Sequence, residues 1–267
     1  MAPPLAALYD RHIAGWRQDN FMLRYALNLP GEELWQAHLE AKQDLITFVN
    51  RETNAGIDSH VLTIGFARRA APYKRSALVF NDLERIRDIA SNVGPFQFVF
   101  AGKAHPKDDE GKKIIQRVID AGKQLGGDVK VAYLENYDMQ LAKLMTGGVD
   151  VWLNTPQPPM EASGTSGMKA ALNGVPSLSV LDGWWIEGHI ENVTGWSIGG
   201  DGDNNGRERW VTDANSFYEK LESAALQKYY GADSKYVDIM RHCIALNGSF
   251  FNTQRMLLQY VTRAYFL

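Results

Sequence analysis

The spacing of apolar residues along this chain changes near residue 61. Before that point apolar residues recur at roughly helical spacing, as Leu34, Leu39 and Leu45 illustrate. From there on, short apolar runs rich in β-branched and aromatic residues alternate with helical patterns. The runs predict five strands, at 61–67, 96–102, 129–134, 149–154 and 176–181. The helical patterns between them predict helices at 82–92, 108–126 and 138–148.

Strands that are apolar on both faces and alternate with helices are typical of a parallel sheet that helices cover on both sides. We therefore predict an α/β fold, a Rossmann-like doubly wound parallel sheet with flanking helices. We expect three parts along the chain: a helical N-terminal segment over 1–50, the sheet domain over 51–235 and C-terminal helices over 236–267.

Composition narrows the possible partners. The 267 residues carry a formal net charge of -3, which gives no electrostatic reason to expect nucleic acid or an anionic membrane as a partner. The N-terminus does not resemble a signal peptide and no stretch approaches a membrane span, so we expect a cytoplasmic protein. Cys243 is the one cysteine, which excludes an intrachain disulfide and indicates a buried structural thiol.

Two signals for a metal ion are weak. The six histidines show no ligand spacing. Residues 201–206, DGDNNG, begin like a calcium-binding loop, but Thr212 stands where the bidentate glutamate belongs. We interpret this stretch as a surface turn and expect no metal.

Cationic residues follow the first predicted strand, and open α/β sheets bind ligands beyond the carboxyl ends of their strands. The stretch RRAAPYKR places Arg68, Arg69, Lys74 and Arg75 in one loop. Arginine and lysine at such a position can hold phosphate. A solvated loop with salt bridges elsewhere in the fold is the alternative.

The segment GTSGMK, 164–169, is similar to a phosphate-binding loop without being one, because Met168 separates Gly167 from Lys169. A turn of small residues before a helix still presents backbone N–H groups and the helix dipole to an anion. We expect Lys169 in the first turn of this helix, an unfavourable place for an exposed cation. That position indicates an anion, an aldehyde or a carboxylate within reach, with an ordinary surface lysine as the alternative.

The stretch DGWWIEG, 182–188, carries a tryptophan pair with two interpretations. Tryptophans often stack on sugar faces, and Trp184 and Trp185 are about as consistent with packing inside the protein.

Five separated motifs, in the same order, closely resemble the C-terminal half of the α-glucan (glycogen, starch or maltodextrin) phosphorylases: RRAAPYKR, FAGKAHP, YLENYDMQLAKL, EASGTSGMKAALNG and LDGWWIEG. The resemblance covers nearly all of residues 8–265. It implies the C-terminal half of a two-domain GT-B glycosyltransferase fold. It also implies retaining phosphorolysis of an α-1,4-glucan to α-glucose 1-phosphate with pyridoxal 5'-phosphate, whose phosphate group rather than its ring takes part in catalysis.

The resemblance also implies a role for individual residues. Lys169 matches the lysine that is bonded covalently to the cofactor, and Arg69 and Lys74 match the residues that bind the substrate phosphate; these three are the implied catalytic residues. The implied cofactor contacts are Lys169, Arg68, Thr165, Ser166, Gly167 and Tyr137. The implied substrate contacts are Glu161, Ala162, Ser163, Gly164 and Tyr73.

In that family the active site lies between two facing domains, and this sequence matches the second. The resemblance implies that the first domain, in cis or in trans, supplies a glycine-rich loop over the phosphates and a histidine near the sugar. We expect that the isolated chain does not turn over and that its cofactor site can be empty. Two alternatives are a nucleotide-sugar glycosyltransferase similar to glycogen synthase, against which Lys169 argues, and a non-catalytic glucan-binding module.

Overall fold

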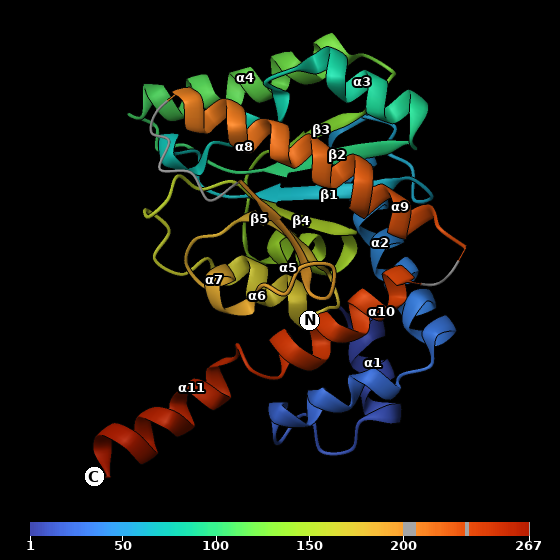
Figure 1. Cartoon of the computed structure of the whole chain (residues 1–267), viewed down its shortest axis with the longest axis vertical. Coiled ribbons are helices and arrows are strands. Elements are labelled where there is room, and N and C mark those ends of the chain that lie inside the picture. Colours follow the sequence, from blue (N-terminus) through green and yellow to red (C-terminus); the bar gives the residue numbers. More distant parts are fainter. Residues whose placement is uncertain (200–206, 233–234, 267) are drawn as a thin grey trace.

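The computed structural model of the chain describes residues 1–199, 207–232 and 235–266, and its centre is one parallel sheet (Figure 1). Six strands lie in the order β3-β2-β1-β4-β5-β6, each paired in parallel with its neighbours. The strands are β1 Leu62–Ala67, β2 Phe96–Ala101, β3 Val131–Leu134, β4 Val151–Asn154, β5 Ser177–Val180 and β6 Gly195–Ile198. The five predicted strands are confirmed to within two residues at either end, and the α/β fold class is confirmed.

Both faces of the central strands are buried, as their apolar runs predict. Alternate residues of a strand point to opposite faces, so Ile64 and Phe66 of β1 join one core cluster and Ala67 joins the other. In the same way, Phe98 of β2 belongs to the first cluster and Val99 to the second. The sheet therefore has a hydrophobic core on each side, which is the basis of its three-layer architecture.

Helices form the two outer layers (Figure 1). One layer holds α3 (Leu83–Asn92), α4 (Asp109–Leu125) and α8 (Arg207–Lys220), and the other holds α2 (Gly31–Thr53), α5 (Met139–Gly148) and α6 (Thr165–Leu172). The first residue before α3, α4 and α5 is an aspartate whose side chain accepts a backbone N–H of the first turn. These caps explain why the three predicted helices are confirmed to within a residue at each end.

The terminal segments are helical but interrupted. In place of one helical stretch over 5–50, the chain forms α1 (Pro3–His12), the 3₁₀ helix η1 (Asn20–Asn28) and α2. Gly15, with a φ of 77°, lies in the first interruption and Pro30 directly precedes α2. The remaining helical elements are α7 Trp185–Gly188, η4 Leu221–Ala225, α9 Leu226–Tyr230, α10 Lys235–His242, η5 Cys243–Gly248, α11 Thr253–Tyr260 and η6 Val261–Tyr265.

The two ends of the chain differ in how they pack. Tyr9 of α1 is fully buried and donates its hydroxyl proton to the carbonyl of Leu172 at the end of α6, over 3.0 Å. By contrast, α11 has no buried residue and extends away from the body of the protein (Figure 1). The N-terminal segment is thus part of the domain core, and α11 is not.

Strand β6 is the element that the sequence pattern did not reveal. It is four residues long, and its residues Gly195 to Ile198 read GWSI, which carries a glycine and a serine and too few β-branched residues to stand out. Pairing with β5 and packing against α8 make it a strand. The sheet therefore has six strands where the sequence predicts five.

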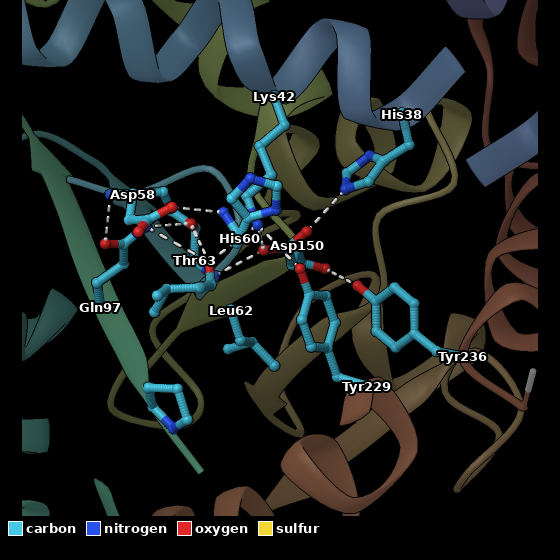
Figure 2. A network of polar contacts seen from close by, with 12 residues as sticks. His38, Lys42, Asp58, His60, Leu62, Thr63, Gln97, Asp150, Tyr229 and Tyr236 are labelled. Atoms are coloured by element: carbon cyan, nitrogen blue, oxygen red, sulfur yellow. Dashed lines mark hydrogen bonds and ion pairs between the residues drawn. The ribbon is translucent and has the colours of Figure 1, made fainter. Parts of the chain in front are cut away.

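A buried ion network fixes α2 to the amino end of β4 (Figure 2). Lys42 donates to Asp150 Oδ2 over 2.6 Å and His38 Nε2 lies 2.8 Å from Asp150 Oδ1. Lys42 also donates to the hydroxyl of Tyr229, and the hydroxyl of Tyr236 donates to the backbone carbonyl of Asp150. The network joins the N-terminal segment, the sheet and the C-terminal helices. It lies at the amino ends of β1 and β4, whereas the predicted ligand loops follow their carboxyl ends.

The structure bears on several smaller predictions. Cys243 is fully buried, as predicted, and burial raises the pKa of its thiol. No described helix is long and apolar enough to cross a membrane. In the described part of the chain, histidine, cysteine, aspartate and glutamate form no group of three or more that could hold a metal ion. Residues 201–206, interpreted as a surface turn, lie outside the described residues.

Candidate functional site

The candidate site lies at the carboxyl ends of β1 and β4. These strands are neighbours in the sheet, and the chain order reverses between them, since β2 and β3 lie on one side and β5 and β6 on the other. Doubly wound sheets bind ligands at such a switch point, because the loops that leave the two strands diverge there. The loop after Ala67 and the loop after Asn154 carry most of the predicted site residues and are brought together at this point, while Tyr137 follows β3 and Lys169 lies in α6.

Glu161 brings two of the predicted cations together. Its Oε2 accepts a short hydrogen bond from Lys74 Nζ and lies 3.5 Å from Arg68 Nη1. The three side chains are only 9%, 13% and 8% exposed for Lys74, Arg68 and Glu161 respectively. The Lys74 ammonium also lies over the ring of Tyr73, 4.5 Å from its centroid. The predicted phosphate ligand, cofactor contact and substrate contact thus form one buried cluster.

Arg68 has more hydrogen-bond donors than partners. Its Nε and Nη2 are buried and have no partner among the described residues. Burial lowers the pKa of the guanidinium, and the nearby Glu161 carboxylate opposes that shift. A buried cation with unused donors costs folding free energy unless an anion meets it. This part of the site therefore fits an anionic group such as a phosphate.

The start of α6 adds to the same anion site. Gly164 directly precedes the helix with a φ of 89°, and a β-carbon on it would lie 3.4 Å from Arg68 Nη2. The free backbone N–H groups of the first turn carry partial positive charge. The hydroxyl of Ser166, in this turn, is also buried without a partner. A guanidinium with two unpaired donors, an unpaired hydroxyl and a helix N-terminus lie in this part of the site, and together they fit an anionic group such as a phosphate.

The position of Lys169 corrects one prediction. Because α6 begins at Thr165, Lys169 lies in its last turn rather than its first. A cation is favourable there, so the argument that an unfavourable dipole indicates a nearby anion does not hold. Lys169 is exposed and lines a groove of about 560 Å³, whose other residues include Ser163 and Met168 of the same segment and the range 251–256 before and in α11.

The turn that follows β5 holds the loop of Glu161 in place. Asp182 Oδ2 accepts the backbone N–H of Glu161 and the backbone N–H of Trp184 donates to the carbonyl of Ser163, both over 2.8 Å. Gly183, with a φ of 57°, lies so close that a β-carbon on it would be 2.5 Å from that same carbonyl oxygen. The predicted sugar-binding residues are therefore fixed from behind by this turn.

The tryptophan pair beside this turn packs inside the protein. Trp184 and Trp185 are 4% and 0% exposed, and a β-carbon on Gly167 would lie 2.8 Å from the Trp184 indole nitrogen. Of the two interpretations, interior packing is the one that the structure supports. The pair positions α6 against the turn after β5.

The two other cations of the RRAAPYKR loop have different surroundings. Arg75 is buried, and it donates to the carbonyls of Thr155 and Pro156 and to Asp213 Oδ2, over 2.9, 2.7 and 2.6 Å. Its role is to join the loops after β1 and β4 to α8, which corrects its place among the candidate phosphate ligands. Arg69 is exposed, and no polar partner of its side chain lies in the described ranges.

The remaining predicted residues surround the cluster. Tyr137 is half-buried, and burial raises the pKa of its hydroxyl while the charge of Arg68 opposes the shift. Ala162 and Thr165 are exposed. Asn154, which the sequence analysis did not single out, ends β4 with a buried Oδ1 that lacks a partner in the described chain. The sequence did carry a signal for this residue, because Asn154 is a polar residue at the end of an otherwise apolar strand and directly precedes the candidate loop.

Comparisons with known proteins agree on one family. A family model described as carbohydrate phosphorylase matches residues 3–196. Maltodextrin phosphorylase of Thermococcus litoralis is 42% identical across 97% of this chain and 33% of its own length. Glycogen phosphorylase of Aquifex aeolicus is 43% identical across 89% of this chain and 37% of its own length. Glycogen phosphorylase of Mycobacterium tuberculosis is 40% identical across 78% of this chain and 25% of its own length.

These matches define both the family and the extent of the similarity. The chain spans about a third of the length of the first two relatives. The family match includes β1 to β5, both candidate loops and Lys169. From the sheet, the cluster at its switch point and these matches, we conclude that the chain belongs to the carbohydrate phosphorylase family.

Proposed function

We propose that this chain forms the cofactor- and phosphate-binding domain of an α-1,4-glucan phosphorylase. The reaction is the retaining phosphorolysis of the glucan to α-glucose 1-phosphate, with pyridoxal 5'-phosphate as cofactor. The observation that carries the proposal is the buried guanidinium of Arg68, whose Nε and Nη2 are unpaired beside the start of α6. Its setting fits a phosphate group better than a neutral sugar, because a desolvated cation needs an opposite charge.

The cofactor would be held by the residues around α6. The amine of Lys169 would bind it covalently, and the α6 N-terminus, Ser166 and Arg68 would hold its phosphate. When bound, pyridoxal 5'-phosphate supplies a phosphate group that exchanges a proton with the substrate phosphate. The role of the exposed Lys169 amine requires that it be reachable from solvent, which its position on the groove allows.

The substrate phosphate would be held by Lys74 and Arg69 at the same edge of the sheet. Two unit negative charges 4 Å apart repel by about 4 kcal/mol at an effective dielectric constant of 20. Two phosphate groups in one site therefore need several cations around them, and Lys74, Arg68 and Arg69 lie on the single loop after β1. These cations would also hold the substrate phosphate in position to bond to the anomeric carbon as the shortened glucan leaves.

The sugar would lie against the loop after β4. Glu161, Ser163 and Gly164 lie on this loop, and Tyr73 lies on the facing one. Carboxylate and hydroxyl groups on a loop held by Asp182 and Gly183 can accept and donate hydrogen bonds to sugar hydroxyls in a fixed geometry. This placement would put the sugar next to the substrate phosphate.

We propose that the active site is completed by a second domain, in cis or in trans, since the relatives are about three times as long as the part that this chain matches. This domain would supply the glycine-rich loop over the phosphates and a histidine near the sugar. The isolated chain would then lack turnover, and a cytoplasmic location stays a prediction of the sequence.

Cofactor uptake tests the proposal directly. The purified chain is incubated with pyridoxal 5'-phosphate, freed of excess reagent and examined by absorbance. Borohydride reduction then fixes any covalent link, and peptide mass mapping locates it. We expect one cofactor per chain on the peptide that contains Lys169, and none in Lys169→Ala.

The matched control is Lys113→Ala, which removes an exposed helical lysine outside the site. This variant should take up cofactor as the unmodified chain does. A folded chain that takes up no cofactor, or a label spread evenly over surface lysines in both variants, would contradict the assignment of Lys169. Such a result would favour a glucan-binding module without this cofactor.

A further inference from the structure

The carboxylate of Glu161 accepts from Lys74, a proposed ligand of the substrate phosphate, and lies 3.5 Å from Nη1 of Arg68. We propose that Glu161 is a built-in competitor for the phosphate site: it closes the cation pair when no phosphate is present, and its displacement by phosphate frees it for the sugar. The inference rests on the proposed function, because it takes the cluster to be a phosphate site. It adds that phosphate displaces the Glu161 carboxylate before that carboxylate binds the sugar, and that the binding of phosphate and the binding of sugar are coupled.

The geometry supports competition because one oxygen serves both cations. Oε2 of Glu161 contacts Lys74 Nζ and lies 3.5 Å from Arg68 Nη1. The substrate phosphate is assigned to Lys74 and Arg69, and to contact Lys74 Nζ on this side it needs the volume that this oxygen occupies. Since the three side chains are at most 13% exposed, solvent cannot screen the contact strongly. Phosphate and the carboxylate are therefore mutually exclusive at this point.

Charge leads to the same conclusion. Lys74 and Arg68 carry two positive charges and Glu161 carries one negative charge, so the cluster has an excess of one positive charge. The unpaired Nε and Nη2 of Arg68 show that a single carboxylate does not satisfy the cations. Adding a phosphate beside the carboxylate would place like charges close together, at a cost of several kcal/mol. Exchange of one anion for the other avoids that repulsion.

The loop is built so that the side chain can move while the backbone stays fixed. The backbone N–H of Glu161 is held by Asp182, and the carbonyl of Ser163 is held by Trp184. The carboxylate itself contacts only Lys74 and Arg68 among the described residues. In this proposal a change of side-chain rotamer releases the carboxylate while these backbone hydrogen bonds persist.

The consequence is positive coupling between phosphate and sugar. Once released, the carboxylate lacks a cation partner, and its oxygen atoms can accept hydrogen bonds from sugar hydroxyls instead. A sugar that binds the released carboxylate stabilises the form that accepts phosphate. By linkage, each ligand must then strengthen the binding of the other by the same factor.

The test measures the affinity of the full 267-residue chain for inorganic phosphate, without cofactor, by calorimetry or ³¹P NMR. Glu161→Gln keeps the size of the side chain and removes its charge. We expect this variant to bind phosphate about tenfold more tightly than the unmodified chain, within the range typical of coupling between sites. Equal or weaker binding by Glu161→Gln, or no binding by either protein, would overturn the proposal and make Glu161 a structural partner of Lys74.

The matched control is Glu187→Gln, which removes the same charge from an exposed residue on the short helix α7. Its affinity for phosphate should stay within about twofold of the unmodified chain. A gain as large as that of Glu161→Gln would show that net charge, and not displacement of a competitor, sets the affinity. Omitting the cofactor separates the outcome from the cofactor test, which can fail while this one succeeds.

A second measurement does not depend on the folding of Glu161→Gln. The unmodified chain is labelled with ¹³C at the glutamate Cδ, and the resonance of Glu161 is assigned as the one absent from Glu161→Asp. Addition of inorganic phosphate should shift this resonance, because the carboxylate loses its two cation partners. A resonance that stays in place while phosphate binds would overturn the proposal.

Discussion

At the residue scale, Asp150 is a buried carboxylate away from the candidate site that interacts with two basic side chains. Its carboxylate is fully buried and accepts from Lys42, from His38 and from the backbone N–H of Thr63 (Figure 2). Burial alone would raise the pKa of Asp150, but the charge of Lys42 and the hydrogen bond of His38 hold it below its ordinary value. A carboxyl group whose pKa is lowered on folding stabilises the folded state while it is ionised.

This network predicts how stability depends on pH. Because the folded-state pKa of Asp150 is lowered, its contribution is complete above the ordinary pKa of about 4 and is lost as pH falls below that value. Asp150→Asn should lower the free energy of unfolding by about 3 to 5 kcal/mol at neutral pH, since it leaves Lys42 buried without its partner. Denaturant unfolding at a series of pH values measures both effects.

The control for this prediction is Asp88→Asn, an exposed residue of α3. It should change the free energy of unfolding by less than about 0.5 kcal/mol. If the unmodified chain and Asp150→Asn lost stability equally between pH 4 and pH 2, the buried network would not be the source of acid sensitivity.

At the element scale, the turn between β5 and α7 decides where α6 and the loop of Glu161 lie. Gly183 makes this possible, because its φ of 57° and its distance from the carbonyl of Ser163 leave no room for a side chain. The neighbouring Trp184 fills the space beside Gly167 of α6. The geometry of the site thus depends on a turn that provides none of its predicted ligands.

Gly183→Ala tests this dependence. A β-carbon 2.5 Å from the Ser163 oxygen forces a backbone shift, so the variant should lose about 1 to 3 kcal/mol of unfolding free energy and hold pyridoxal 5'-phosphate more weakly. Thermal unfolding and cofactor retention after dialysis measure the two effects. Gly127→Ala is the control, because a β-carbon there meets no atom within 4 Å. Equal behaviour of the two variants would refute the role of this turn.

At the scale of the whole molecule, the C-terminal elements α11 and η6 project from the domain, and Gln254 at the start of α11 is hydrogen-bonded to Gln18 and Asn20 of the N-terminal segment (Figure 1). Neither has a buried residue in the described range, and several of their apolar side chains are exposed. The large exposed ones are Met256, Leu257, Leu258, Tyr260 and Tyr265, and Phe266 directly after η6 is exposed as well. Exposed apolar side chains that are close together along the chain favour association with other apolar surfaces, including those of a second copy.

Truncation after Asn252 separates the domain from this surface. Because α11 buries no residue in the core, the shortened chain should unfold within about 1 kcal/mol of the full chain. It should also self-associate less, because the exposed apolar side chains are gone. Light scattering over a concentration series and denaturant unfolding provide the two readouts. A large loss of stability would show that α11 belongs to the cooperative unit after all.

Most strands and helices of the sheet domain could be predicted because their signals lie in the local sequence. The strands of the centre are apolar on both faces, and the helices α3, α4 and α5 begin at aspartate caps, so both signals lie within a few residues of the element that they specify. Where the signal was not local, prediction failed. Strand β6 forms through pairing with β5, and the start of α6 at Thr165 depends on Gly164 and its packing against Trp184.

The sequence by itself determined the fold class, the family and the two loops that meet at the switch point, because apolar spacing and the order of the motifs can be recognised from the chain alone. Tertiary structure alone decided which cationic side chains keep donors available for a ligand. Arg75 meets Asp213, 138 residues away, and Lys74 meets Glu161, 87 residues away, while Arg68 keeps two buried donors unpaired. The charge that a ligand meets depends on such distant partners, and no local pattern encodes which side chains the folded chain brings within hydrogen-bond reach.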